Sequence, residues 1–234
     1  MMLGARNGAW AQSGGGGEWT NPYITDGLVG YWDGEWNSEG GKHDAVQDSL
    51  VDLSGGGHDM TFVGTHQLNP KSVTIDGVAS GAYGSINGLT WGPQSTQEFV
   101  VNITSNQMYG RMIAENKGLC VLNSPGGFSV GHCYGYGTDG PIGKLKSVLL
   151  GLPLSVVMTY DGTYLRYYVN GQYENSRLQN FNSYLSGQTT FFNRINGGRG
   201  IDGQLHSVRL YSRALSADEI ADNYSVDKTR FNLK

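Results

Sequence analysis

Paired acids are the first residues whose spacing could carry chemistry. A retaining glycosidase needs two carboxyl groups about 5–5.5 Å apart, and acids at alternate positions of a strand lie on one face. Glu98 heads a strand-like stretch, but the alternate positions after it hold Val100 and Asn102. The other acids considered lie in a glycine-rich loop or lack an acidic partner: Glu35, Glu39 and Glu115. No strand pairs two acids, so we do not expect an enzyme.

Histidine and aspartate side chains gather in the first loops, and they allow two interpretations. The group comprises His43, Asp44, Asp48, Asp52, His58 and Asp59. Imidazoles and carboxylates can build a metal site. Aspartates among glycines also serve turns in a solvated polar loop. We favour the loop, and we expect the Asp52 carboxylate to cap the turn that follows it.

Composition limits the class of protein that must position these residues. The 234 residues include 37 Gly, 14 Tyr and 15% charged residues, which indicates short strands joined by tight turns. The net charge of −4 and the absence of a Lys/Arg cluster argue against nucleic acid as a partner. No apolar run approaches the roughly 20 residues that span a membrane, so we expect no membrane insertion. The first residues lack the apolar core of a signal peptide.

Two dipeptides predict a three-stranded antiparallel meander within residues 154–173. Asp161-Gly162 and Asn170-Gly171 favour positive φ and are strong hairpin signals. Leu165, Tyr167 and Val169 should share one face of the middle strand, because side chains alternate along a strand. Tyr164, Arg166 and Tyr168 should share the other face.

One helix is predicted near the end of the chain. Ser216 and Glu219 have the spacing of a capping box. Ile220 and Tyr224 are four residues apart and lie on one helix face. The helix is too short to be stable alone, so we expect it to dock at an end or edge of a sandwich.

Two cysteines flank a turn signal at residues 123–127. If the hairpin pivots midway, Cys120 and Cys133 lie opposite each other and can form a disulfide. A one-residue slip removes that pairing. Free thiols are the favoured interpretation, and the spacing does not indicate zinc.

Three motifs together resemble concanavalin A-like jelly rolls of the laminin-G-like group. They are LVGYWDG with DLSGGGHDMTF at residues 28–62, VMTYDGTYLRYYVNG at 157–171 and IDGQLHSVRLYSRALSADEI at 201–220. The resemblance covers residues 27–225. It implies an all-β jelly-roll sandwich of two antiparallel sheets with one short C-terminal helix.

The resemblance also implies glycan binding. Sugars stack on aromatic rings while loop groups bond their hydroxyls. The candidate aromatic residues are Trp36, Tyr83, Trp91, Tyr109, Tyr134 and Tyr136. For each ring, plain packing in the sheets is the alternative, and the fold alone does not prove sugar binding.

Calcium is the usual ion of the resembled group, which binds it through acids of the opening and closing strands. Asp33 matches the opening position. His206 stands where the closing acid is expected, and imidazole is a poor calcium ligand. Asp76 and Asp202 are other oxygen donors, on different motifs. We therefore claim no certain cofactor.

Together these features predict a binding module rather than an enzyme. Residues 1–26 should form a flexible arm and residues 27–234 a laminin-G-like domain. The loop at 36–44 and the tail at 223–231 resemble a branch found in bacteriophage and prophage proteins of gut bacteria. That branch implies a virion or cell-surface location, a cell-surface receptor or glycan as partner, and attachment to other virion or surface-assembly proteins through the arm. The alternatives are a structural decoration protein that binds no sugar and a glycoside hydrolase with unusual acids.

Overall fold

The structure is a computed structural model. It describes residues 20–36, 49–90, 92, 94–106, 110–114, 118–124, 127–134, 137–138, 151–178, 188–195 and 197–234. For residues 114, 118–124, 127–134 and 137–138, only the backbone is described. Among these ranges, no helix is long and apolar enough to cross a membrane.

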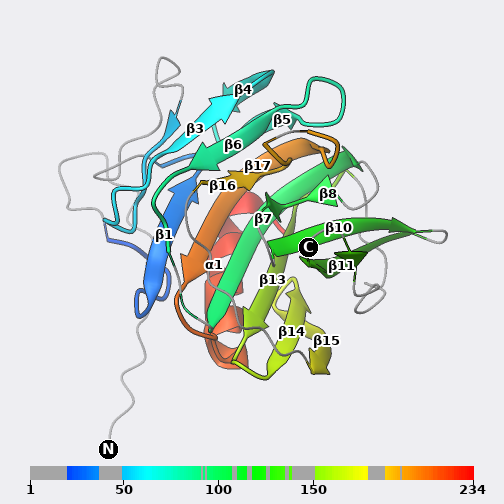
Figure 1. The fold of residues 1–234 in the computed structure, drawn as a ribbon. Coiled ribbons are helices and arrows are strands. Elements are labelled where there is room, and N and C mark those ends of the chain that lie inside the picture. Colours follow the sequence, from blue (N-terminus) through cyan, green and yellow to red (C-terminus); the bar gives the residue numbers. More distant parts are fainter. Residues whose placement is uncertain are drawn as a thin grey trace, which may run out of the picture.

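The largest element is an eight-stranded antiparallel sheet that contains both the first and the last strand (Figure 1). Its strand order is β15-β14-β13-β7-β17-β5-β4, and β1 also pairs with β17. The strands are β1 (Leu28–Asp33), β4 (His66–Asn69), β5 (Ser72–Asp76), β7 (Ser95–Asn106), β13 (Leu154–Tyr160), β14 (Tyr164–Val169), β15 (Gln172–Leu178) and β17 (Ile201–Tyr211). Long β7 and β17 run side by side at its centre.

A second layer faces this sheet. A five-stranded sheet has the order β2-β3-β6-β16-β9, with β2 (Ser49–Leu50), β3 (Met60–Val63), β6 (Tyr83–Ile86), β16 (Thr189–Phe191) and β9 (Ile113–Ala114). A four-stranded sheet has the order β12-β11-β10-β8, with β12 (Gly137–Thr138), β11 (Gly127–Tyr134), β10 (Gly118–Ser124) and β8 (Gly110–Arg111).

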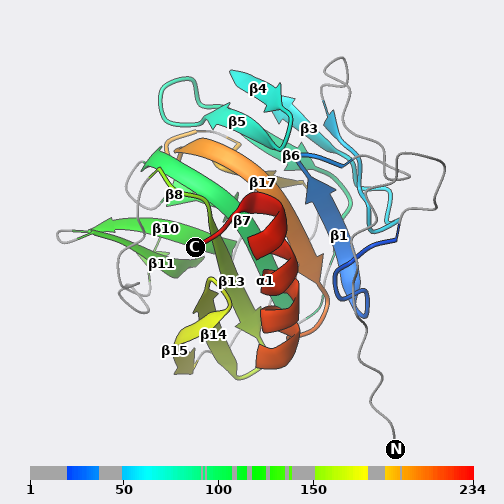
Figure 2. The same cartoon turned by 180° about the vertical axis from the view of Figure 1, so that it is seen from behind.

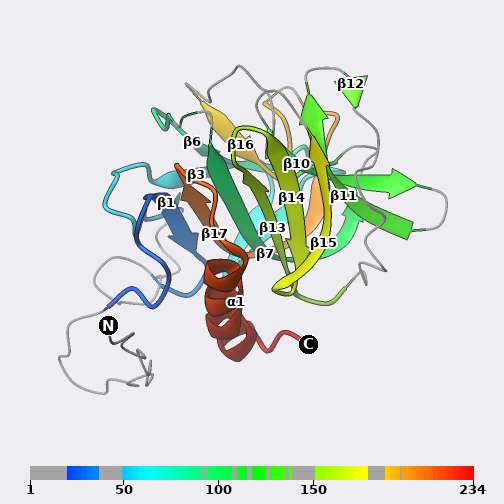
Figure 3. The same ribbon diagram turned by 90° about the horizontal axis from the view of Figure 1, so that it is seen from below.

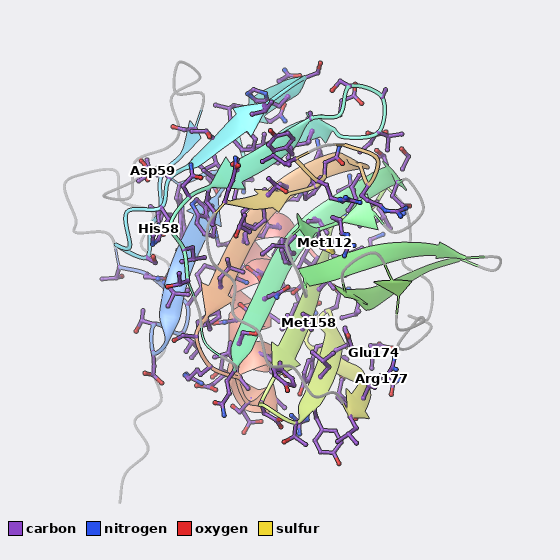
Figure 4. The ribbon with its side chains drawn as sticks, in the orientation of Figure 1. His58, Asp59, Met112, Met158, Glu174 and Arg177 are labelled. Atoms are coloured by element: carbon purple, nitrogen blue, oxygen red, sulfur yellow. The ribbon has the colours of Figure 1, made fainter. Side chains whose placement is uncertain are left out.

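The core fills the space between the layers with alternating side chains of the strands. Trp32, Phe99 and Phe191 are fully buried there, and the ring of Phe191 lies against both other rings. Met112 and Met158 lie near the centre of the molecule (Figure 4). Because inward residues alternate with outward ones, the same strands present a separate set of side chains outside. The predicted all-β sandwich is confirmed.

The predicted meander is also confirmed. β13 pairs with β14, and β14 with β15, across turns at Asp161-Gly162 and Asn170-Gly171. Asn170 and Gly171 both have positive φ, at 47° and 72°, as a two-residue hairpin turn requires. Leu165 and Tyr167 point into the core, whereas Tyr168 lies in a cluster on the other face of the sheet.

Helix α1 (Ala217–Phe231) forms a third layer outside the eight-stranded sheet (Figure 2). Viewed from below, it lies on the opposite side of that sheet from β6 and β16 (Figure 3). The predicted capping box between Ser216 and Glu219 is present. We expected docking at an end or edge. The helix instead covers the face of the sheet, because polar side chains of the central strands bind it there.

In the hairpin of β10 and β11, Ser124 pairs with Gly127, so the pairing is centred one residue earlier in the chain than the midpoint between the cysteines. The register therefore pairs Cys120 with Gly131 and Cys133 with Gly118. Residues displaced by two positions across a strand pair are about 7–8 Å apart, beyond the usual Cα separation of a disulfide. The midway pivot needed for a directly opposed disulfide does not occur.

Candidate functional site

A groove of about 350 Å³ with both polar and apolar lining lies on the outer face of the eight-stranded sheet. It is formed by the neighbouring strands β5, β17 and β7. Its polar lining residues lie at alternate, outward positions of the strands, and Ile75 and Gly203 complete the lining. The polar lining residues are Thr74, Asp76, Asn102, Thr104, Asp202 and Gln204.

Two carboxylates lie side by side on paired strands of this groove. Asp76 of β5 is the register partner of Asp202 of β17. Asp202 accepts hydrogen bonds from the Val78 N–H at 2.7 Å and the Ser105 hydroxyl at 2.5 Å. Asp76 accepts the N–H of Ala79 at 3.1 Å. No lysine or arginine is among the lining residues, so neither charge is neutralised within the groove.

A bulge in β7, opposite Asp202 and Gly203 of β17, lies beside these acids. The register of β17 against β7 shifts between Asp202 and Gly203. Gly203 has a φ of 158°, and a Cβ there would lie 2.1 Å from the carbonyl oxygen of Asn102. Only glycine lets the two backbones approach this closely. The bulge therefore depends on the residue type at position 203.

Amide side chains complete the groove. The Nδ2 of Asn102 donates to the Oε1 of Gln204 at 3.3 Å. The Oδ1 of Asn102 is buried and has no hydrogen-bond partner. The Thr74 hydroxyl accepts a bond from Asn69 at 2.8 Å and keeps its own proton to donate. Carboxylates, amides and hydroxyls at this density suit a ligand rich in hydroxyl or amino groups.

Next to the groove, α1 covers a buried network of charged residues. Arg209 of β17 donates to Glu98 of β7 at 2.8 Å and to both oxygens of Asp227 on α1, at 3.0 and 2.5 Å. Its guanidinium also stacks on the ring of Tyr23, 3.8 Å from the centroid. Burial raises the pKa of Glu98, although Arg209 opposes that rise. This acid, the first considered for hydrolysis, is thus enclosed in an ion pair.

A second arginine of α1 extends the network to the first strand. Arg230 donates to both oxygens of Asp33 at 2.7 and 2.8 Å. Burial alone would raise the pKa of Asp33, but the Arg230 guanidinium and the N–H groups of Glu35 and Trp36 bring it below its usual value. The guanidinium carbon of Arg230 also lies over the ring of Trp36, 3.5 Å from its centroid.

The predicted sugar-stacking residues do not form one described platform. Trp36 is half-buried against Arg230, after β1. Tyr83 is half-buried in β6 of the five-stranded sheet, opposite Val63. Tyr134 ends the backbone of β11, and its side chain is outside the description. Three predicted residues lie outside the described residues: Trp91, Tyr109 and Tyr136.

Exposed aromatic rings occur elsewhere, on the outer face of the sheet's far edge. Tyr164 is 42% exposed and Tyr173 is 55% exposed. Tyr173 packs edge-on against buried Tyr168. The strands β14 and β15 that carry them are separated from the groove by β13. This edge is a second surface on which a sugar ring could stack.

The first-loop group separates in the structure. Asp52 accepts bonds from the N–H groups of Tyr31, Ser54 and His58, so it caps the turn as predicted. His58 and Asp59 lie beside β1 (Figure 4), and the Nδ1 of His58 bonds the carbonyl of Asn87 at 2.9 Å. His43, Asp44 and Asp48 fall outside the described residues. Within the described part, no three His, Cys, Asp or Glu side chains gather into a group that could hold a metal ion.

His206 serves packing between β17 and the end of α1. Its Nδ1 bonds the carbonyl of Lys71 at 3.0 Å, and its ring lies 5.3 Å from that of Phe231. Burial lowers the pKa of His206. The neutral ring favoured by this burial is compatible with an apolar neighbour.

The groove was missed by a search for acids along single strands. Asp76 and Asp202 are 126 residues apart and meet only because β5 pairs with β17. Each strand does carry a sign of an outward polar surface. The polar residues stand at positions 74 and 76, 102 and 104, and 202 and 204, and buried residues lie between or beside them. What the sequence lacks is the order of the strands.

Comparison with known proteins places this geometry in context. Residues 80–221 match the model of a family described as the concanavalin A-like lectin/glucanases superfamily. No curated protein matches the sequence.

Solved structures share the fold at low sequence identity. Domain 4 of AbnA, an extracellular arabinanase from Geobacillus stearothermophilus in complex with arabinotriose, has a TM-score of 0.65 and 14% identity over 84% of this chain and 98% of that domain. The botulinum neurotoxin serotype D binding domain has a TM-score of 0.58 and 17% identity over 88% of this chain. The Trypanosoma rangeli sialidase in complex with sialic acid has a TM-score of 0.60 and 19% identity over 86%. This chain covers 53% of the toxin domain and 33% of the sialidase.

Proposed function

The chain belongs to the concanavalin A-like lectin/glucanases superfamily, and from this premise we propose that it is a non-catalytic module that binds a glycan in the groove of β5, β17 and β7. The observation that carries the proposal is the set of polar side chains converging on this one hollow of the sheet. Asp, Asn, Gln and Thr are the groups that bond sugar hydroxyls. The arabinotriose bound to the arabinanase domain supports the ligand class by analogy.

We propose that the module binds its glycan without hydrolysing it. Glu98 is held by Arg209 and Asn223 beneath α1 and is fully buried, so it cannot reach a substrate. The groove holds the remaining pair of described acids that meet across strands, Asp76 and Asp202. Within the described strands, this is the pair that a glycosidase activity could use. A reducing-sugar assay on every glycan that binds should detect no turnover.

The test of glycan binding is an array of bacterial, host and plant glycans probed with the full chain, followed by titration calorimetry of each positive. Gln204→Ala and Thr104→Ala should weaken binding by about tenfold each, since each removes a hydrogen bond to the ligand. Tyr173→Ala at the far edge should leave affinity unchanged. Loss of binding on Tyr173→Ala alone would move the site to the edge, and silence on the array would favour a decoration protein.

The location we propose is a bacteriophage or prophage virion, or a cell surface, with a surface glycan or receptor as the target. The resemblance of residues 36–44 and 223–231 to a phage branch supports this proposal. Residues 1–26 would attach the domain to other virion or surface-assembly proteins. Pull-down of virion proteins with the full chain and with a chain lacking residues 1–19 tests it, because attachment through the arm should disappear in the shorter chain.

Calcium does not fit the described surroundings of Asp33. Both carboxylate oxygens receive hydrogen bonds from the Arg230 guanidinium, whose charge would repel a cation, and calcium needs six to eight oxygen ligands. We therefore expect EDTA and calcium chloride to give the same melting temperature. A rise in melting temperature with calcium that disappears in Asp33→Asn would contradict this expectation.

A further inference from the structure

We infer that the sugar bound in the groove carries an ammonium group, so that the ligand class is a hexosamine with a free amine. The inference rests on the proposed function and narrows it to one class. It is carried by the two acids, Asp76 and Asp202, which face the same groove from paired strands without a basic residue in the lining.

Two other described acids on this face of the sheet, Glu98 and Asp33, are neutralised. Glu98 pairs with Arg209 and Asp33 pairs with Arg230, each at hydrogen-bond distance. Asp76 and Asp202 form no ion pair with any described residue. Their partners are backbone N–H groups of residues 78–80 and the Ser105 hydroxyl. These two negative charges therefore lie side by side in the hollow, and a hollow concentrates the field of its lining charges.

The two carboxylates of the groove have unused capacity to accept hydrogen bonds. The Asn102 amide nitrogen is occupied by Gln204, whereas the Asn102 Oδ1 is buried without a donor. The carboxylates of Asp76 and Asp202 accept and cannot donate. A ligand that supplies donors therefore suits the two carboxylates.

An ammonium group matches both properties. It offers three N–H donors and one positive charge, and hydrogen bonds between charged partners are roughly twice as strong as neutral ones. An N-acetylated sugar offers a single uncharged N–H at the same position. A uronic or sialic acid brings another negative charge toward Asp76 and Asp202, which opposes binding.

Titration calorimetry with the full chain, at mildly acidic pH, tests the inference with three oligosaccharides of equal length: glucosamine, N-acetylglucosamine and galacturonic acid tetramers. The glucosamine tetramer should bind at least about tenfold more tightly than the acetylated one, given the strength of a charge-assisted bond. Added salt should reduce this preference, because salt screens the carboxylates. The galacturonic acid tetramer should bind most weakly.

Matched variants assign the preference to the groove. Asp202→Asn and Asp76→Asn keep an oxygen that accepts the backbone N–H groups but remove the charge, and each should reduce the preference for the free amine. Asn102→Asp adds a third negative charge to the groove and should increase the preference for the free amine. Glu174→Gln is the control, because Glu174 lies on β15 at the far edge of the sheet (Figure 4). Melting temperatures identify any variant that does not fold.

Three results would overturn the inference. Equal or tighter binding of the acetylated or acidic tetramer shows that the groove does not select an amine, and glycan binding itself would then stand. Amine binding that requires calcium shows that a metal, and not the ammonium group, contacts the acids. Silence of all three tetramers together with a silent glycan array would remove the proposed function as well.

Discussion

At the residue scale, burial turns ordinary surface residue types into a charged framework. Tyr23, Asp33, Arg209, Asp227 and Arg230 are at most 8% exposed, and each hydrogen-bonds to another member of this set. Removing one partner of a buried ion pair costs about 3–5 kcal/mol, because the other charge remains without compensation. The residues therefore constrain one another, and their contribution depends on protonation.

Asp33 should make stability depend on pH in a defined direction. Its pKa is lower in the folded state than usual, so it binds fewer protons when folded. Its stabilising contribution is present above the unfolded pKa of about 3.9 and is lost as pH falls through the folded value. Asp33→Asn should cost about 3 kcal/mol at neutral pH. The free energy of unfolding, measured with urea at several pH values, should differ less between the variant and the wild type below about pH 4. An equal difference at every pH would contradict this assignment.

Single residues were predictable from sequence where their role is local. Asp52 was identified as a turn cap because it bonds to residues 54 and 58, a few positions along the chain. Asp33 was placed at the correct strand, but its partner Arg230 is 197 residues away. No spacing rule links the two, so the sequence alone suggested a metal ligand.

At the element scale, features that depend on contacts between nearby residues could be predicted from the sequence, and features that depend on distant contacts could not. The turns at Asp161-Gly162 and Asn170-Gly171 and the cap of α1 follow from adjacent residues, and all are present. The docking face of α1 was not foreseen. It depends on Glu98 and Arg209, whose strands become neighbours only in the finished sheet.

The capping box should contribute a measurable share to the stability of α1. Ser216 accepts the N–H of Glu219, and Glu219 in turn accepts the Ser216 N–H at 2.8 Å. Ser216→Ala should cost about 1 kcal/mol, which is a fall in melting temperature of about 2–4 °C for a domain of this size. Ser225→Ala, on an exposed position of the same helix, should cause no such fall. Equal effects of both variants in calorimetry would argue against a role for the cap.

Position 203 of β17, which faces the bulge in β7, should tolerate no side chain. A Cβ at Gly203 would lie 2.1 Å from the Asn102 carbonyl oxygen, so the β17 and β7 backbones must separate to admit it. Gly203→Ala should cost about 1–3 kcal/mol and weaken glycan binding in the groove. Gly92→Ala is the matched control, because nothing lies within 4 Å of a Cβ at that glycine. Thermal unfolding and calorimetry on both variants would separate the clash from a general effect of losing glycine.

At the scale of the whole molecule, the first and last described segments close the fold together. Tyr23 donates to Asp227 of α1 at 2.7 Å and accepts from Arg230 at 2.8 Å. The N–H of Ile24 donates to Asn223 at 3.0 Å. The boundary between arm and domain at residues 26 and 27 remains a prediction, but these contacts are made from its arm side. The outer face of the sheet thus has two parts. One part is covered by α1 and Tyr23, and the other part contains the open groove.

A pair of truncations tests whether residues 20–26 belong to the folded unit. A chain of residues 27–234 loses Tyr23 and leaves hydrogen-bonding groups of Asp227 and Asn223 without these partners. It should be less stable than residues 20–234 by about 1–3 kcal/mol, the cost of unsatisfied buried groups. Tyr23→Phe in residues 20–234 should give part of this loss, because it keeps the ring on Arg209 but removes the hydroxyl. Hydrogen exchange should show faster exchange confined to α1 in the shorter chain. Equal stability of the two truncated chains would instead assign all residues up to 26 to the arm.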